Sequence, residues 1–379
     1  MIIKRLTYTQ DNGWSAPLPD WDSSQTLVMA FADSAYFDDH APFLELRSMY
    51  PHSHLIGCST SGEISQDRVV DQSLSVAVAQ FEKTPLAHAS AFVEAYPSSV
   101  EVGYTLGAQL NSPDLRMVLV LANGSNVNGS ALVEGIHQAV GSQVMISGGL
   151  AGDGARFERT WVIEGGIPQI GYVTAVGLYG DALEMGFGNG GGWESTNQNY
   201  TVTRAVDNVL YELDGEPALE VYKRYIGIFA GDLPSIALIF PFLMVDPNGQ
   251  EESLVRTILN IDPRNASMIF AGDIKEGYQV RFMRAFMDNL VNGAQSAAQQ
   301  IQVPTQTTPI LSIAVSCVGR RLVMKDQTRK ELSAVLKVLP TQTEQVGFYS
   351  YGEISPGRDR VARLYNQTMT LTTLTERLN

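Results

Sequence analysis

Two similar stretches, "GCSTSGEI" at residues 57–64 and "GFYSYGEI" at residues 347–354, carry side chains that could bind a polar ligand. Each follows an apolar run and supplies hydroxyl groups, a glycine and a glutamate. Glycine permits a tight turn at a strand end, and hydroxyl and carboxylate groups hydrogen-bond polar ligands. For one copy alone, the alternative is a polar turn whose carboxylate caps nearby backbone N–H groups. The repetition favours a cleft lined by Ser59, Thr60, Ser61, Glu63, Tyr351 and Glu353.

Two further charged residues could face this cleft. Asp153 follows a glycine turn in "SGGLAGDG", where the alternative is an Asp that caps the turn. Arg320 ends the apolar run "ILSIAVSCVG", so its guanidinium is expected at the rim of a core and needs an anionic partner. The candidate partners are Asp153, Glu63, Glu353 or a ligand carboxylate.

Other chemistries have weaker support in the sequence. Cys58 could be a nucleophile with His52 or His54 as base, but it closes an apolar strand, where a free cysteine is usually buried. His137 borders the apolar face of a helix and could be a haem ligand or a core histidine. The run "GFGNGGG" has no amphipathic helix after it, so it is predicted to be irregular rather than a dinucleotide site.

Composition narrows the class of protein. The chain has 379 residues, a net charge of −14 and 44% hydrophobic residues, which suits a globular protein of two domains. The negative charge argues against nucleic acid and anionic membranes as partners. Two cysteines, no apolar amino-terminal segment and no long apolar run predict a cytoplasmic protein without membrane insertion.

Strand-like and helix-like segments alternate along the whole chain. Residues 25–31 and 116–122 have the apolar pattern of buried strands, whereas residues 130–140 and 328–339 have helical periodicity. We therefore predict an α+β fold of two packed α/β-type domains with mixed sheets and an internal repeat. The first domain is expected at residues 25–213 and the second at 214–362, with a closing strand to about residue 375.

The order of the motifs resembles that of the FIST sensory proteins. The matching stretches are "GCSTSGEI", "SGGLAGD", the junction "LYELDGEPALEVY", "SCVGRR", "GFYSYGEI" and "YNQT". The resemblance implies FIST N-terminal and C-terminal domains, and it adds Asn366 of the last motif to the expected ligand-binding residues. Tyr365 departs from the family pattern, which often has histidine there.

The resemblance implies a signal-input protein rather than an enzyme. It would bind a small ligand and signal through a separate partner, such as a histidine kinase, a cyclase or a chemotaxis component. The alternative that the resemblance implies is a haem-binding nitric-oxide sensor acting on a histidine kinase or a cyclic-di-GMP enzyme. A cysteine-dependent enzyme using Cys58 is the third hypothesis. The sequence names neither the ligand nor the partner.

Overall fold

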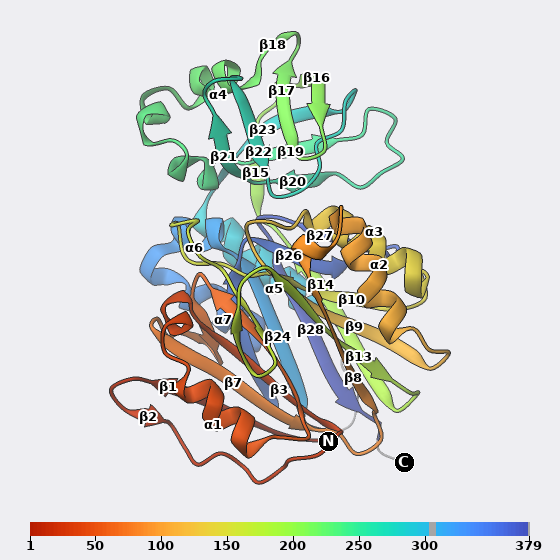
Figure 1. Ribbon diagram of the computed structural model, residues 1–379. Helices are drawn as coiled ribbons and strands as arrows, with labels where there is room; N and C mark the ends of the chain where they lie inside the picture. The colour runs from red at the N-terminus through yellow and green to blue at the C-terminus, as the bar shows by residue number, and fades with distance from the viewer. Residues whose placement is uncertain (303–307, 378–379) are drawn as a thin grey trace.

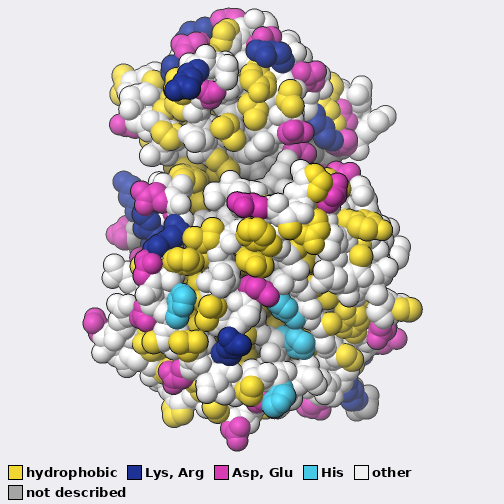
Figure 2. All heavy atoms as spheres, viewed as in Figure 1, with side chains coloured by type: hydrophobic (Ala, Val, Ile, Leu, Met, Phe, Trp, Pro, Cys, Tyr) yellow, Lys and Arg dark blue, Asp and Glu magenta, His cyan; other side chains and the backbone are white. Residues whose placement is uncertain are grey.

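A computed structural model describes residues 1–302 and 308–377 of the chain. The molecule has a large body and a smaller lobe, which is drawn at the top of Figure 1. Seen in space-filling view, the surface narrows to a waist between them (Figure 2). The predicted α/β architecture with mixed sheets is confirmed.

The body consists of three units that share one central order of elements: a long strand, a helical segment, a second long strand, a short hairpin and a third long strand. The first contains β3 (Thr26–Asp33), α1 (Ala41–Met49), β4 (His54–Thr60), β5 (Glu63–Ser65), β6 (Arg68–Val69), β7 (Ser73–Gln80) and β8 (Leu86–Phe92). The second contains α2 (Ser99–Leu110), β9 (Leu115–Ala122), α3 (Gly129–Val140), β10 (Met145–Leu150), β11 (Val162–Glu164), β12 (Ile167–Gln169), β13 (Tyr172–Tyr179) and β14 (Leu183–Gly190). The third contains α5 (Met287–Gln299), β24 (Ile310–Cys317), α6 (Val318–Met324), α7 (Arg329–Leu336), β25 (Thr343–Ser350), β26 (Gly352–Pro356), β27 (Ala362–Tyr365) and β28 (Met369–Glu376). The internal repeat is therefore threefold.

The three units are interlocked by their strand pairing. In each unit the first two long strands are parallel (β3 and β4, β9 and β10, β24 and β25), and the next long strand is antiparallel to the first. The short hairpin between the second and the third long strand of each unit joins the sheet of another unit: β5 pairs with β25, β11 with β4, and β26 with β10. Edge strands are exchanged too, because β8 pairs with β13 and β14 with β28. The amino-terminal β1 (Ile2–Thr9), followed by β2 (Gly13–Trp14), completes the cycle by pairing with β7.

The three sheets enclose a common core. Equivalent strands supply Leu27, Met29 and Phe31 from β3, Met117, Leu119 and Leu121 from β9, and Leu311, Ile313 and Val315 from β24. Their alternation reflects the two-residue period of a strand. The opposite face of each sheet is covered by helices or loops, as expected for apolar strands buried on both faces.

Residues 186–190 of the glycine-rich run belong to β14, so the prediction of irregular structure was wrong for them, whereas Gly191 and Gly192 lie outside the strand. Its glycines allow the backbone of α5 to lie directly on β14. A side-chain carbon at Gly188 would lie 1.9 Å from the carbonyl oxygen of Ala297, and one at Gly190 would lie 2.0 Å from that of Gly293. The close approach of α5 to β14, rather than the formation of a turn, explains why this run is rich in glycine.

The lobe is formed by the chain between β14 and α5. It contains β15 (Trp193–Ser195), β16 (Tyr200–Val206), β17 (Val209–Leu213), β18 (Glu216–Pro217), α4 (Ala218–Ile226), β19 (Phe242–Val245), β20 (Leu254–Arg256), β21 (Ile258–Asp262), β22 (Ser267–Phe270) and β23 (Gln279–Ala285). These elements share their own hydrophobic core. The sequence boundary at Asp214 lies inside the lobe, between β17 and β18. Among the described helices, none has the length and apolar character needed to cross a membrane.

Candidate functional site

The turns of the three units meet in a ring. The backbone N–H of Ser61 donates to the carbonyl of Tyr349 at 2.8 Å, and the N–H of Tyr349 donates to the carbonyl of Gly62 at 2.9 Å. The N–H of Tyr351 reaches the carbonyl of Leu150 at 3.2 Å, and the N–H of Gly152 reaches that of Ser59 at 3.0 Å. The "SGGLAGD" turn is thus the third copy of the motif. Asp153 follows Gly152 there, one residue before the position that Glu63 and Glu353 occupy in the other two turns.

The two glutamates make equivalent internal contacts. Glu353 accepts hydrogen bonds from the Ser350 hydroxyl at 2.6 Å and from the backbone N–H and hydroxyl of Thr368 at 3.1 and 2.9 Å. Glu63 accepts from the Thr60 hydroxyl and from the backbone N–H of Ser73 at 3.3 Å. Burial raises the pKa of each carboxyl to about 8, and these hydrogen bonds oppose the rise.

Asp153 closes the third turn in a different way. Its carboxylate accepts backbone hydrogen bonds from Phe157, Glu158 and Arg159 at 2.8–2.9 Å. The Tyr351 hydroxyl also donates to it, which ties the second unit to the third. Asp153 thus caps its own turn, which is the alternative that the sequence offered for this residue.

The residues that the sequence proposed for ligand binding are all buried. Each is at most 2% exposed: Ser59, Thr60, Ser61, Glu63, Asp153, Arg320, Tyr351, Glu353 and Asn366. The structure brings seven of them together in the ring, and Asn366 contacts the ring by donating to the Tyr351 carbonyl at 3.5 Å. Arg320 lies apart from the ring, and the polar groups of all nine are engaged internally. Asp153 also borders a surface pocket with Ser34 and Arg156. A direct ligand role for these nine residues stays a prediction, and their contacts show how the three units are held together.

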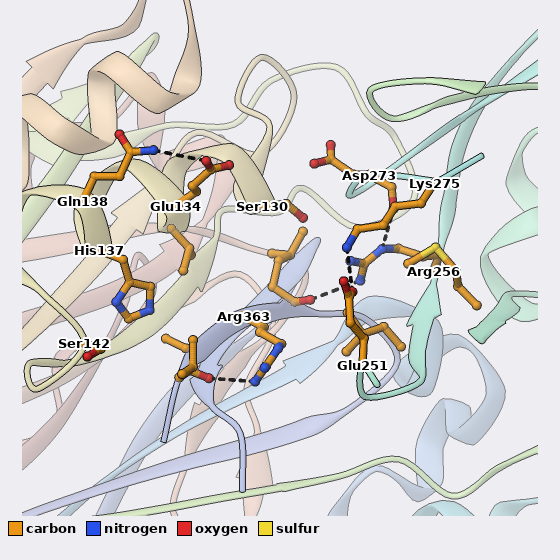
Figure 3. A pocket seen from close by; sticks show the side chains of 16 residues that line it. Ser130, Glu134, His137, Gln138, Ser142, Glu251, Arg256, Asp273, Lys275 and Arg363 are labelled. Atoms are coloured by element: carbon orange, nitrogen blue, oxygen red, sulfur yellow. Dashed lines mark hydrogen bonds and ion pairs between the residues drawn. The ribbon is translucent and has the colours of Figure 1, made fainter. Parts of the chain in front are cut away.

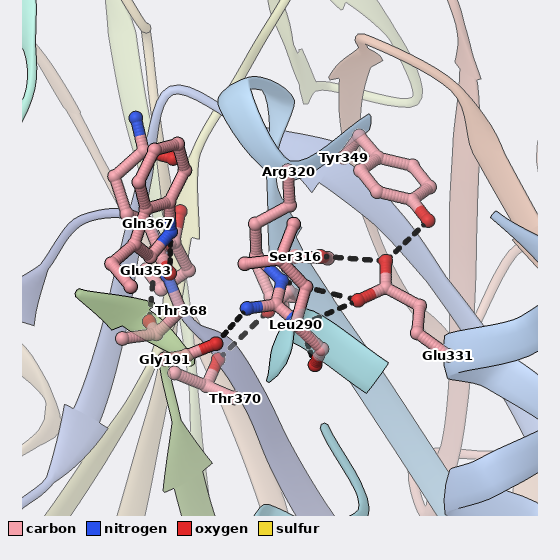
Figure 4. A network of polar contacts seen from close by, with 12 residues as sticks. Gly191, Leu290, Ser316, Arg320, Glu331, Tyr349, Glu353, Gln367, Thr368 and Thr370 are labelled. Carbon is pink, nitrogen blue, oxygen red and sulfur yellow. Dashed lines mark hydrogen bonds and ion pairs between the residues drawn. The ribbon is translucent and has the colours of Figure 1, made fainter. Parts of the chain in front are cut away.

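Arg320 lies in α6 rather than at the end of a strand, and its partner is a residue that the sequence did not suggest. Its guanidinium pairs with Glu331 of α7 at 2.7 Å, and both side chains are fully buried (Figure 4). Glu331 also accepts from Tyr349 at 2.6 Å and from Ser316 at 3.2 Å. Arg320 further donates to the carbonyls of Gly191 and Leu290. The expectation of Asp153, Glu63 or Glu353 as partner was therefore wrong, and the internal pair leaves no requirement for a ligand carboxylate.

Cys58 lacks the environment of a nucleophile. Its side chain is fully buried in β4, and burial raises the pKa of the thiol well above its usual range. A reactive cysteine needs an accessible thiolate. The other thiol, Cys317, is also buried.

The waist holds a pocket of about 540 Å³ between body and lobe, which we call the interlobe pocket (Figure 3). A volume of this size at a domain interface is typical of small-molecule sites. The body contributes α3 and β27, and the lobe contributes β19, β20 and the segment after β22. The lining comprises Ser130, Val133, Glu134, His137, Gln138, Ser142, Met244, Glu251, Leu254, Arg256, Asp273, Lys275, Val361, Ala362, Arg363 and Leu364.

Arg256 is a buried cation in this pocket. It is 3% exposed, and its Nε and Nη1 donate to the carbonyls of Asp273 at 3.0 Å and Leu364 at 3.1 Å. Among the described residues, no carboxylate lies within ion-pair distance of it, and Nη2 makes no hydrogen bond. Burial lowers the pKa of Arg256 to about 10, and the nearby charge of Asp273 only partly offsets this effect. A buried charge without an ionic partner is costly, so this guanidinium is suited to an anionic ligand.

His137 and Ser130 line the same pocket from α3. The Ser130 hydroxyl and both ring nitrogens of His137 are buried without a hydrogen bond of normal geometry to any described residue. Burial lowers the pKa of His137, although the backbone of Ala362 and Gly141 lies close enough to oppose the shift. The imidazole is therefore held mainly neutral. The structure thus places the haem-ligand candidate in the pocket and away from the ring of turns.

Asn366 and Gln367 connect the lobe to the body beside the pocket. The Asn366 carbonyl oxygen accepts from the backbone N–H of Thr257 at 3.3 Å. Gln367 donates to the Leu238 carbonyl at 2.7 Å and to the Thr257 hydroxyl at 2.9 Å. Thr257 directly follows Arg256 in the sequence, so this connection lies next to the buried guanidinium.

Reasoning from the sequence missed Arg256, Lys275 and Arg363. Each lies in an ordinary-looking segment, and they meet only because the β26–β27 hairpin and the lobe converge on α3. Arg256 follows "SLV" and precedes "TIL", so a charge between apolar residues was the one available signal. Within the residues that the structure describes, no group of three His, Cys, Asp or Glu side chains is arranged to hold a metal ion.

Comparison with individual known proteins gives distant matches. The chain is 25% identical over 224 residues to the uncharacterised protein MJ1623 of Methanocaldococcus jannaschii, a match that covers 55% of this chain and 41% of the relative. The matched region is thus less than half of the relative's length. A crystal structure of cyanuric acid hydrolase from A. caulinodans aligns with 100% of this chain and 99% of its own at 10% identity. Its TM-score is 0.39, which is too low to support an argument about this chain.

Comparison with protein families shows which family the chain belongs to. The FIST N domain matches residues 26–216, and the FIST C domain matches residues 218–356. Together the two domains cover most of the sequence, including all three turns of the ring. The chain belongs to the FIST family.

Proposed function

We propose that this protein is a sensor whose small-molecule site is the interlobe pocket. FIST domains are associated with sensing in signal transduction. The single observation that carries the assignment of the site is Arg256, a buried guanidinium in a pocket of ligand size with no carboxylate partner among the described residues. An anionic group of a ligand would supply that partner.

The position of the pocket supports signalling by movement of the lobe. A ligand there would touch α3 of the body and β20 of the lobe at once, so it would favour the lobe position in which both contacts are made. We propose that a separate partner chain, such as a histidine kinase, a cyclase or a chemotaxis component, reads this position. In this proposal the protein has no catalytic activity of its own.

Ligand-induced stabilisation tests the proposal. A library of small metabolites is screened by thermal unfolding, because a ligand at a hundred times its Kd stabilises the folded chain by about 2.7 kcal/mol. The matched variant is Leu254→Trp, which fills the pocket from the half-buried β20. A hit should raise the Tm of the natural protein and not that of the variant. Equal shifts in both proteins would place the ligand elsewhere.

Haem binding is the second candidate, because His137 offers a neutral imidazole without a hydrogen bond of normal geometry. A histidine of this kind could hold the haem iron, and Arg256 in the same pocket could pair with a haem propionate. Both ring nitrogens are covered by protein in this structure, so binding of iron would require the imidazole to turn towards the pocket; bound haem would supply a gas-binding iron. Protein produced with haem supplementation should then show a Soret band that His137→Ala abolishes. A colourless protein would exclude this candidate.

A further inference from the structure

The interlobe pocket combines an apolar wall with one unsatisfied cation. Val133, Met244 and Leu364 are nearly fully buried around it, and half-buried Leu254 completes the wall. Figure 3 places Arg256 and His137 on opposite sides of the pocket. A ligand that filled this space would be apolar along its body and anionic where it meets Arg256.

The charges around the pocket favour a single negative charge on the ligand. Lys275 is paired with Glu251 at 2.6 Å, and Arg363 is paired with Asp359 at 2.8 Å. The Asp273 carboxylate accepts from Asn128 at 2.6 Å. Of the three cations in the described pocket lining, only Arg256 has no ion pair, and the carboxylates of Glu134 and Asp273 line the same pocket. The pocket therefore offers one place for an anionic group, and the second charge of a dianion such as phosphate would be repelled.

We infer that the interlobe pocket binds an amphipathic monocarboxylate, with the carboxylate on Arg256 and the apolar chain or ring against Val133, Met244, Leu254 and Leu364. The inference rests on the proposed function of this pocket as the ligand site. A carboxylate matches the flat edge of a guanidinium and accepts from Nη2, whose donors are otherwise unused. Burial of the apolar part of the ligand against these side chains adds favourable binding free energy. The unpaired atoms of His137 and Ser130 can accept or donate to one polar substituent on that remainder.

Three probes of equal length separate charge from apolar size. Octanoate, 1-octanol and the dianion suberate are titrated into the full-length protein by calorimetry, with inorganic phosphate as a fourth probe. Octanoate should bind at least about tenfold more tightly than 1-octanol and suberate, the scale of one charged hydrogen bond. Phosphate should not bind. Binding of suberate or phosphate tighter than that of octanoate, or equal binding of octanoate and 1-octanol, would overturn the inference.

Three variants locate the binding and keep the test independent of folding defects. Arg256→Gln should weaken octanoate by about tenfold or more and leave 1-octanol unchanged. Arg204→Gln is the matched control, since this arginine of the lobe is paired with Glu212 at 2.9 Å and lies outside the pocket lining, and it should leave octanoate affinity within about twofold. Leu254→Trp should abolish binding of both probes. If Arg256→Gln does not fold, the comparison of probes on the natural protein still decides the inference.

The outcomes also separate this inference from the proposed function. If polar metabolites stabilise the protein and Leu254→Trp removes that effect, while octanoate does not bind, the pocket is a ligand site and the amphipathic class is wrong. If neither the metabolites nor the probes bind in a manner sensitive to Leu254→Trp, both proposals fail.

Discussion

At the scale of single residues, the buried ion pair between Arg320 and Glu331 joins α6 to α7. Replacing Glu331 with Gln should lower the free energy of unfolding by about 3–5 kcal/mol, because it leaves the Arg320 charge buried and unpaired. Urea unfolding measures the loss, and ligand affinity should not change. The double variant Arg320→Met with Glu331→Leu should be less destabilised than the single one, since no charge stays buried. A single variant as stable as the natural protein would contradict this role.

The ring glutamates predict how stability depends on pH. Burial raises the pKa of Glu63 and Glu353 from 4.5 to about 8, so the folded chain holds protons that the unfolded chain releases. Their contribution is therefore complete below about pH 4.5 and is lost as the pH rises towards 8. In the variants Glu63→Gln and Glu353→Gln, the free energy of unfolding should fall less steeply as the pH rises, by up to about 1 kcal/mol per pH unit for each substitution. The exposed Glu94→Gln is the control, and denaturant unfolding between pH 5 and 8 is the measurement. If the free energy of unfolding depended on pH in the same way in all these proteins, the raised pKa of the two glutamates would be refuted.

At the scale of elements, the contact of β14 with α5 depends on glycine. Gly188→Ala should separate the helix from the strand and lower the free energy of unfolding by about 1–3 kcal/mol, the usual cost of overpacking. The control is Gly231→Ala in the lobe, where a side-chain carbon meets no atom within 4 Å. Thermal and urea unfolding compare the two. If both substitutions had the same effect, the close approach would not be what requires glycine at residue 188.

At the scale of the whole molecule, the lobe is an insertion into a threefold body. The equivalent link between the first two units is the short segment from β8 to α2. Gly192 lies against Asn289 and Leu290, so the two ends of the insertion are close together. Replacing residues 193–286 with a short Gly-Ser linker should therefore give a body that unfolds cooperatively, with interlobe ligands no longer bound. Circular dichroism and urea unfolding test this, and a molten or aggregated product would show that the body depends on the lobe.

The sequence alone determined the alternation of elements, the family and two of the three ring turns. Apolar periodicity is a local property, and the shared letters Gly-Glu-Ile marked the turns at Glu63 and Glu353. The third turn was predicted as a glycine turn with Asp153 but not as a copy of the other two, because it lacks the Gly-Glu-Ile letters and has Gly154 where they have glutamate. Only the tertiary structure decided that hairpins cross between sheets, that Arg320 pairs with Glu331, and that Arg256 meets His137 across one pocket. These features join segments more than a hundred residues apart or depend on strand register and helix packing, which local periodicity does not encode.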